Sequence, residues 1–149
     1  KFTTKSRALA DAQSLALGND QQFIEPQHLL LALLQQDDGG TTSLLARAGV
    51  NVAGLKKDLD QALTRLPKIE GHGGDVSVGR DLGNLLNLTD KEAQKRGDQF
   101  IASEMFLLAL ADDKGEVGRL ARQHGLNRKA LEAAVDAVRG GQGVDSQEA

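Results

Sequence analysis

The residues that could do chemistry are a few histidines and two pairs of carboxylates. Glu25 and His28 stand together at the expected start of a short helix, and such a pair could contribute to a metal site. Metal sites are usually built from three or four clustered ligands, and the neighbouring sequence supplies no others. We therefore interpret His28 as a polar group at a helix terminus and expect no metal. His72 falls in a glycine-rich linker, and His124 has an alanine at the matching position of an internal repeat described below.

The two carboxylate pairs are Asp37-Asp38 and Asp112-Asp113. Paired carboxylates can act as a general acid and a general base. Both pairs, however, follow apolar helical segments and stand in polar loops, where acidic side chains are normally solvated. We interpret both pairs as surface carboxylates.

Known catalytic and nucleotide-binding motifs are missing from the sequence. There is no G-x-x-x-x-G-K-[ST] phosphate loop, G-x-S-x-G elbow or H-E-x-x-H motif. The glycine-rich run Gly71–Gly74 follows no strand, so we interpret it as a linker. The sequence therefore predicts a chain that is not an enzyme and holds no cofactor.

The composition favours a globular protein that binds neither nucleic acid nor membranes. Apolar residues make up 40 % and charged residues 26 %, with a net charge of -3, four Phe and no Tyr, Trp or Cys. An acidic chain with few aromatic side chains offers little to phosphates or bases. The longest apolar run, Leu29 to Leu34, is far shorter than the roughly 18 residues of a membrane span. The lack of Cys fits a cytoplasmic protein.

Helical periodicity dominates the chain, with apolar residues three and four positions apart. One such stripe is formed by Val52, Leu55, Leu59, Ala62, Leu63 and Leu66. Helix ends are predicted at Gly18, Gly49, Gly97 and Gly125. Helix starts are predicted at Pro26 and after the N-caps Asn51 and Asn127. We expect no sheet, because the alternating segment Val76–Val78 is too short to form one.

An internal repeat organises these helices. Residues 23–34 read FIEPQHLLLALL and residues 100–110 read FIASEMFLLAL, 77 positions later. Pairing Gly18 with Gly97 requires two extra residues in the first copy. Each copy has four helices, and its short apolar helix should lie inside a bundle. We therefore predict an all-α fold, an eight-helix bundle made of two pseudo-twofold-related four-helix repeats, with a groove at their seam.

The predicted domain covers residues 1–141, with repeat one at about 2–66, a linker at 67–79 and repeat two at about 80–139. Residues 142–149 are expected to begin a flexible linker, because the segment is rich in glycine and then polar. An isolated domain of this kind is expected to be monomeric.

The sequence resembles the N-terminal domain of the Clp family of AAA+ unfoldases across residues 2 to 141. The segments ALADAQSLALG at 8–18, FIEPQHLLLALL at 23–34 and QKRGDQFIASE at 94–104 resemble the ClpB-type disaggregase branch in particular, as does LPKIEG at 66–71. Peptidase-linked members instead tend to carry a G-T-E-H-type motif where this chain has residues 24–28.

The resemblance implies a role in a stress-response chaperone. The domain would engage exposed hydrophobic segments of unfolded or aggregated proteins for an ATP-dependent disaggregase, without chemistry of its own. ATP and magnesium would bind only in ATPase modules outside this chain, and those modules would form a cytoplasmic hexameric ring. Expected partners are unfolded polypeptides and the remainder of the parent chaperone. The alternative is an adaptor-docking domain that binds one folded partner.

The resemblance also implies five substrate-binding positions. These are Thr3, Leu86, Asp98, Glu104 and Met105. An apolar groove with an acidic rim could hold hydrophobic segments that also carry basic residues. The other interpretation of Leu86 and Met105 is core packing, because apolar residues at helical spacing are usually buried.

Overall fold

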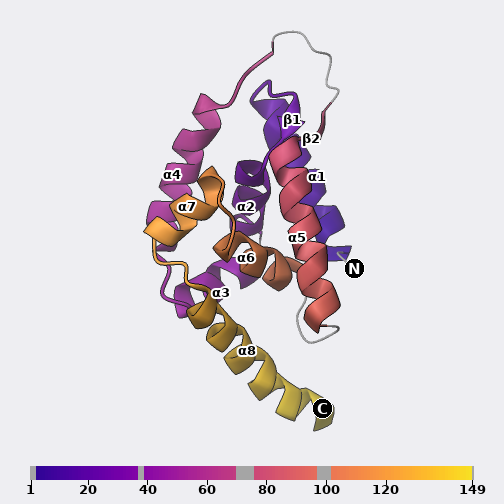
Figure 1. The fold of residues 1–149 in the computed structure, drawn as a ribbon, viewed down its shortest axis with the longest axis vertical. Coiled ribbons are helices and arrows are strands. Elements are labelled where there is room, and N and C mark those ends of the chain that lie inside the picture. The colour runs from indigo at the N-terminus through magenta and orange to yellow at the C-terminus, as the bar shows by residue number, and fades with distance from the viewer. Residues whose placement is uncertain (1–2, 37–38, 70–75, 97–101, 149) are drawn as a thin grey trace.

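The structure, a computed structural model, describes residues 3–36, 39–69, 76–96 and 102–148. Eight helices form within these residues, in the order that the sequence predicts (Figure 1). They are α1 (Thr3–Gly18), α2 (Pro26–Leu34), α3 (Gly40–Arg47), α4 (Val52–Arg65), α5 (Arg80–Arg96), α6 (Ala102–Ala111), α7 (Glu116–Gln123) and α8 (Arg128–Glu148). The all-α prediction with four helices per copy is confirmed.

The two short apolar helices α2 and α6 form the centre of the bundle. All nine residues of α2 are buried, and residues 103–111 of α6 are buried as well. In Figure 1 both helices lie between the pair α4 and α7 on one side and the pair α1 and α5 on the other. A helix that is apolar on every face is stable only inside a core, which is the position the sequence predicts for these two.

Two very short strands pair repeat one with the segment just before repeat two, where the sequence predicted no sheet. Strand β1 (Phe23–Ile24) pairs in parallel with β2 (Ser77–Val78). The amide N–H of Ser77 donates to the carbonyl of Gln22 at 3.2 Å, and that of Gly79 donates to the carbonyl of Ile24 at 2.9 Å. The prediction failed because the partner strand is remote in sequence, and pairing depends on tertiary structure rather than on the local alternation of residues.

Helix ends follow the predicted chemistry. Asn51 caps α4 by accepting a hydrogen bond from the Gly54 amide at 3.1 Å, and Asn127 caps α8 in the same way through Ala130 at 2.9 Å. Proline occupies the first position of α2. Gly97 lies outside the described residues.

The two glycine turns meet where the copies are joined. Gly49 and Gly125 have φ of +91° and +106°, values that L-amino-acid side chains rarely tolerate. A Cβ on Gly125 would lie 2.7 Å from the carbonyl oxygen of Gly49, so the turns pack back to back. The Asn51 amide also donates to the His124 carbonyl at 2.8 Å. This contact between equivalent turns agrees with the predicted pseudo-twofold relation.

The structure corrects the alignment of the first helices. A uniform shift of 77 positions pairs the helix starts Thr3 and Arg80, without the gap that pairing Gly18 with Gly97 requires. It also pairs the buried Ala8 and Ala12 with the buried Leu85 and Thr89. The gapped alignment instead pairs these alanines with the exposed residues Asn87 and Lys91. Burial identifies equivalent positions more reliably here than the two glycines do.

The last helix continues beyond the predicted domain. Helix α8 runs to Glu148, through residues 142–148 that the sequence assigned to a linker. In Figure 1 this helix extends away from the bundle toward the C-terminus. The domain and linker boundaries remain predictions.

Candidate functional site

The predicted site residue Glu104 is buried in an ion pair between helices. It is 5 % exposed and lies in the first turn of α6. Arg139 of α8 donates to both of its carboxylate oxygens, from Nη2 to Oε2 at 2.8 Å and from Nε to each oxygen at 3.2 Å. The carboxylate that the resemblance placed on a groove rim thus holds α6 against α8.

The apolar site residues Leu86 and Met105 lie on the adjacent helices α5 and α6. Met105 is 5 % exposed and belongs to the core, whereas Leu86 is half-buried and packs against it. Of this pair only Leu86 presents accessible surface to a partner. Thr3 is the first residue of α1 and its side chain is not described, and Asp98 lies outside the described residues.

Sequence reasoning missed Leu88, which is 39 % exposed on α5. At about 100° per residue, the stripe formed by Leu82, Leu85 and Thr89 faces the core, and Leu86 and Leu88 fall on its two flanks. The sequence carries this signal, because an apolar residue outside the helical stripe is expected at the surface.

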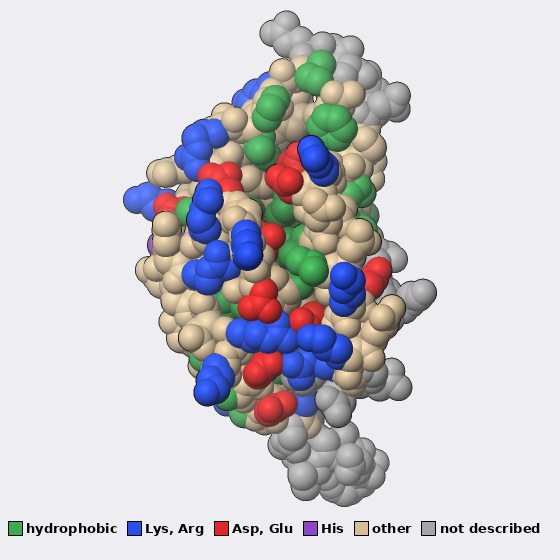
Figure 2. Space-filling model, in the orientation of Figure 1, with side chains coloured by type: hydrophobic (Ala, Val, Ile, Leu, Met, Phe, Trp, Pro, Cys, Tyr) green, Lys and Arg blue, Asp and Glu red, His purple; other side chains and the backbone are tan. Residues whose placement is uncertain are grey.

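A second group of exposed apolar side chains lies at the end of the molecule that carries β1 and β2. Phe23 is 45 % exposed and Ile69 is 38 % exposed, and both line a cavity of about 90 Å³. The remaining lining residues are Gln21, Gln22, Glu25, Leu66 and Pro67. Figure 2 shows hydrophobic side chains gathered at this end of the molecule. We call this feature the Phe23 cavity.

The acidic wall of the Phe23 cavity is Glu25, the N-cap of α2. Its side chain accepts from the amide of His28, and the His28 side chain accepts in turn from the amide of Glu25, at 2.8 Å. The Oε1 atom of Glu25 is buried and has no hydrogen-bond partner among the described residues. Burial, with a smaller contribution from the negative charge of Asp81, raises the pKa of Glu25.

His28 is completely buried, and both of its ring nitrogens are engaged. Nδ1 accepts from the Glu25 amide, and Nε2 lies 2.6 Å from Oε1 of Gln21. Gln21 in turn donates to the carbonyl of Leu63 at 2.7 Å. Burial lowers the pKa of His28 to about 4, so the ring is neutral near pH 7. His28 therefore has a structural role and links α2 to the loops around it by hydrogen bonds. This agrees with its interpretation as a polar group at a helix terminus.

The other candidate groups also have structural partners. Asp112 accepts from Arg128 at 2.6 Å on the surface, and His124 Nε2 lies 2.7 Å from Asp58. Residues 37 and 38 lie outside the described residues, as does His72. Within the described ranges, no three His, Asp or Glu side chains are grouped closely enough to hold a metal ion. The same ranges contain no helix long and apolar enough to cross a membrane.

The chain belongs to the family described as the Clp repeat (R) N-terminal domain, which matches residues 1–124. It is 48 % identical over 150 residues to a protein of Vibrio cholerae named chaperone protein ClpB, and 46 % identical to the protein of the same name from Pseudomonas putida. Each alignment covers the whole of this chain but only 18 % of the relative. The family is a repeat domain and not an ATPase module, in agreement with the expectation of a non-catalytic chain.

A solved structure shows the same fold. The Hsp104 N-terminal domain from Candida albicans matches with a TM-score of 0.77 and 19 % sequence identity, covering 93 % of this chain and 91 % of that one. At this level of identity the likeness concerns the fold alone. It agrees with the all-α double repeat described above.

Proposed function

We propose that the chain engages exposed hydrophobic segments of unfolded or aggregated polypeptides, as the N-terminal domain of a ClpB-like ATP-dependent chaperone. The observation that carries the proposal is the Phe23 cavity. Apolar side chains scattered singly on a surface have no special meaning, but here Phe23, Leu66, Pro67 and Ile69 line one hollow. A cavity of about 90 Å³ has room for one apolar side chain of an extended segment.

The cavity also offers polar groups to the backbone of a bound segment. Gln22 is half-buried beside Phe23, and its amide can donate to a carbonyl or accept from an amide. The Glu25 carboxylate gives this end of the molecule an acidic group, which favours segments that carry basic residues. A small apolar contact with polar surroundings suits weak and unselective binding of flexible chains, which lose entropy when they bind.

Leu86 and Leu88 on the two flanks of α5 provide further contact surface in this proposal. Thr3 and Asp98 remain predicted contacts. Glu104 and Met105 contribute indirectly in this proposal, because they hold α6 in the core against which Leu86 packs.

The parent protein supplies the chemistry in this proposal. The chain spans about a fifth of the length of the curated relatives that it matches. ATP hydrolysis with magnesium, assembly into a six-membered cytoplasmic ring and threading of the polypeptide belong to the remainder of such a parent. The domain itself would be monomeric and would deliver captured segments to that machinery.

The Phe23 cavity can be tested by measuring the affinity of the chain for a reduced, carboxymethylated protein that carries a fluorophore. Phe23→Ser and Ile69→Ser should each weaken binding about tenfold, because each removes apolar area buried on binding. Leu17→Ser is the matched control, since Leu17 is 37 % exposed but does not line the cavity. Equal affinities in all three variants would contradict the proposal. Capture of one folded protein in a fixed ratio, without affinity for unfolded chains, would favour adaptor docking instead.

A further inference from the structure

The two repeats differ in the notch between their first and second helices, which is filled in repeat two and open in repeat one. In repeat two the notch between α5 and the C-terminal end of α6 is filled by the side chain of Arg128. Its Nη2 donates to Glu92 on α5 at 2.9 Å, and its Nη1 donates to Asp112 after α6 at 2.6 Å. Nη1 also lies 3.4 Å from the carbonyl oxygen of Leu108. The guanidinium thus binds both an acidic helix face and the carbonyl-rich end of a helix.

The shift of 77 positions between the copies identifies the residues of repeat one that are equivalent to those around this notch. Glu92 and Asp112 correspond there to Leu15 and Gln35, and Ala109 corresponds to Ala32. These three residues of repeat one line a cavity of about 290 Å³ between α1 and α2, together with Asp11 and Ser14. The arginine-filled notch of repeat two therefore has an open counterpart in repeat one.

The residue that would fill the notch also differs between the two repeats. At the last helix of each copy the two N-caps, Asn51 and Asn127, are 76 positions apart instead of 77. Arg128 follows its N-cap as the first residue of α8, and Val52 holds the same place in α4. A valine is too short to reach across the notch, and it packs against the core instead.

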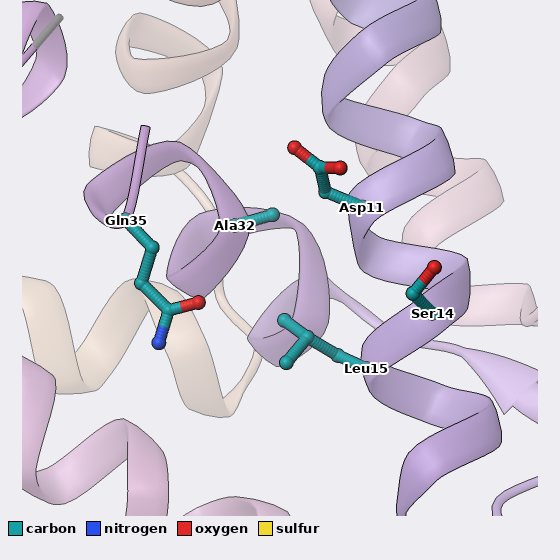
Figure 3. Close-up of a pocket in the computed structure, with 5 residues that line it drawn as sticks. All are labelled: Asp11, Ser14, Leu15, Ala32 and Gln35. Atoms are coloured by element: carbon teal, nitrogen blue, oxygen red, sulfur yellow. The ribbon is translucent and has the colours of Figure 1, made fainter. Parts of the chain in front are cut away.

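The lining of the open cavity suits the side chain of an arginine or a lysine. In Figure 3, Asp11 and Leu15 project from α1 toward α2, and Ala32 points back toward α1. Leu15 and Ala32 offer an apolar surface to an aliphatic stem, while Asp11 offers a carboxylate to a cationic head. Gln35 is the C-cap of α2, where the helix dipole also favours positive charge. The described residues place no ion pair on Asp11.

We propose that this cavity, lined by Asp11, Ser14, Leu15, Ala32 and Gln35, is a binding site for a basic side chain of a bound polypeptide. In repeat two the equivalent position is filled by Arg128 of the same chain. In repeat one the cavity would instead receive an arginine or lysine side chain from the bound polypeptide. The choice of a polypeptide as ligand rests on the proposed function, whereas the affinity for a guanidinium or ammonium group follows from the cavity itself. Together with the Phe23 cavity, the site would favour segments that combine apolar and basic residues.

The experiment titrates the 15N-labelled chain with N-acetyl-arginine amide and follows the amide resonances of α1 and α2. N-acetyl-citrulline amide is the matched control probe, because it has nearly the same shape without the charge. We expect saturable shifts confined to the neighbourhood of Asp11, Leu15 and Gln35 with the arginine probe, at millimolar concentration and weakened by salt. The citrulline probe should shift these resonances at least tenfold more weakly.

Three variants of the chain complete the test. Asp11→Asn should weaken binding of the arginine probe by about tenfold, and Asp60→Asn, which removes an exposed carboxylate of α4, should leave it unchanged. Val52→Arg should abolish it by filling the notch from within, as Arg128 does in repeat two. Equal binding of both probes, or an unchanged affinity in Asp11→Asn, would overturn the proposal. Because the probe is a single amino acid, this outcome is independent of whether the chain binds unfolded proteins.

Discussion

The carboxylate of Glu104 on α6 and the guanidinium of Arg139 on α8 form a bidentate ion pair, and the Glu104 side chain is only 7 % exposed. The pair fastens the last helix to the central helix of repeat two. Since α8 leads toward the C-terminus, the carboxylate controls how this helix is seated on the bundle rather than forming an open rim. Its removal should therefore affect stability first and binding second.

Replacing Arg139 by methionine should lower the free energy of unfolding by about 2 kcal/mol, because it removes the guanidinium that donates to both oxygens of a buried carboxylate. The loss is smaller than for a fully buried pair, since the Arg139 side chain is 33 % exposed. Arg65→Met removes the exposed pair with Glu116 and should cost less than about 1 kcal/mol. Urea denaturation of both variants measures the difference, and equal losses would show that the Glu104 pair contributes no more than a surface pair.

His28 should make the fold sensitive to acid. Its folded pKa of about 4 lies below the unfolded value of 6.5, so the unfolded state binds more protons between these pH values. The stability contributed by the neutral ring is complete above pH 6.5 and is lost as the pH falls toward 4. The loss amounts to roughly 3 kcal/mol at most, at 1.36 kcal/mol per pKa unit.

Glu25 has the opposite effect on the pH dependence of stability. Its pKa is raised in the folded state, so the stability that it contributes is lost as the pH rises. A His28→Asn variant separates the two groups, since it keeps Glu25 and removes only the titrating ring. Its stability should depend less steeply on pH between 6.5 and 4 than that of the unmodified chain. Parallel curves from urea titrations at several pH values would rule out His28 as the cause.

The two glycine turns should tolerate alanine unequally. Gly49→Ala places a Cβ in open space but at φ of +91°, so it should cost about 1–2 kcal/mol from backbone strain alone. Gly125→Ala adds a clash with the carbonyl of Gly49, and the cost should exceed that of Gly49→Ala by at least about 1 kcal/mol. Thermal unfolding of the two variants measures the difference, and a smaller cost for Gly125→Ala would contradict the packing of one turn against the other.

Substitutions at Leu88 and at Met105 should have different effects, the first on binding and the second on stability. Leu88→Ser removes an exposed side chain and should weaken binding of an unfolded polypeptide several-fold while leaving the melting temperature unchanged. Met105→Ala creates a cavity in the core and should cost about 2–4 kcal/mol of stability. Differential scanning calorimetry and a binding titration on both variants test this. A stable Met105→Ala variant with lost binding would instead identify Met105 as a direct contact.

The sequence predicts most of the fold but less of the candidate site. The repeated phrase, the apolar stripes and the caps Asn51 and Asn127 locate the helices, because these signals are local. The pairing of β1 with β2 could not be predicted, since it joins residues more than 50 positions apart. The burial of Glu104 was also beyond sequence reasoning, because its partner Arg139 comes from another helix that only tertiary packing brings close.

The most direct test of the central claim compares one protein in two states. The affinity of the chain for a reduced, carboxymethylated protein can be measured by fluorescence polarisation beside its affinity for the same protein in its native, disulfide-bonded form. The account predicts saturable, micromolar-to-millimolar binding of the unfolded form and at least tenfold weaker binding of the folded one. Equal affinity for both forms, or no binding of the unfolded form, would contradict it.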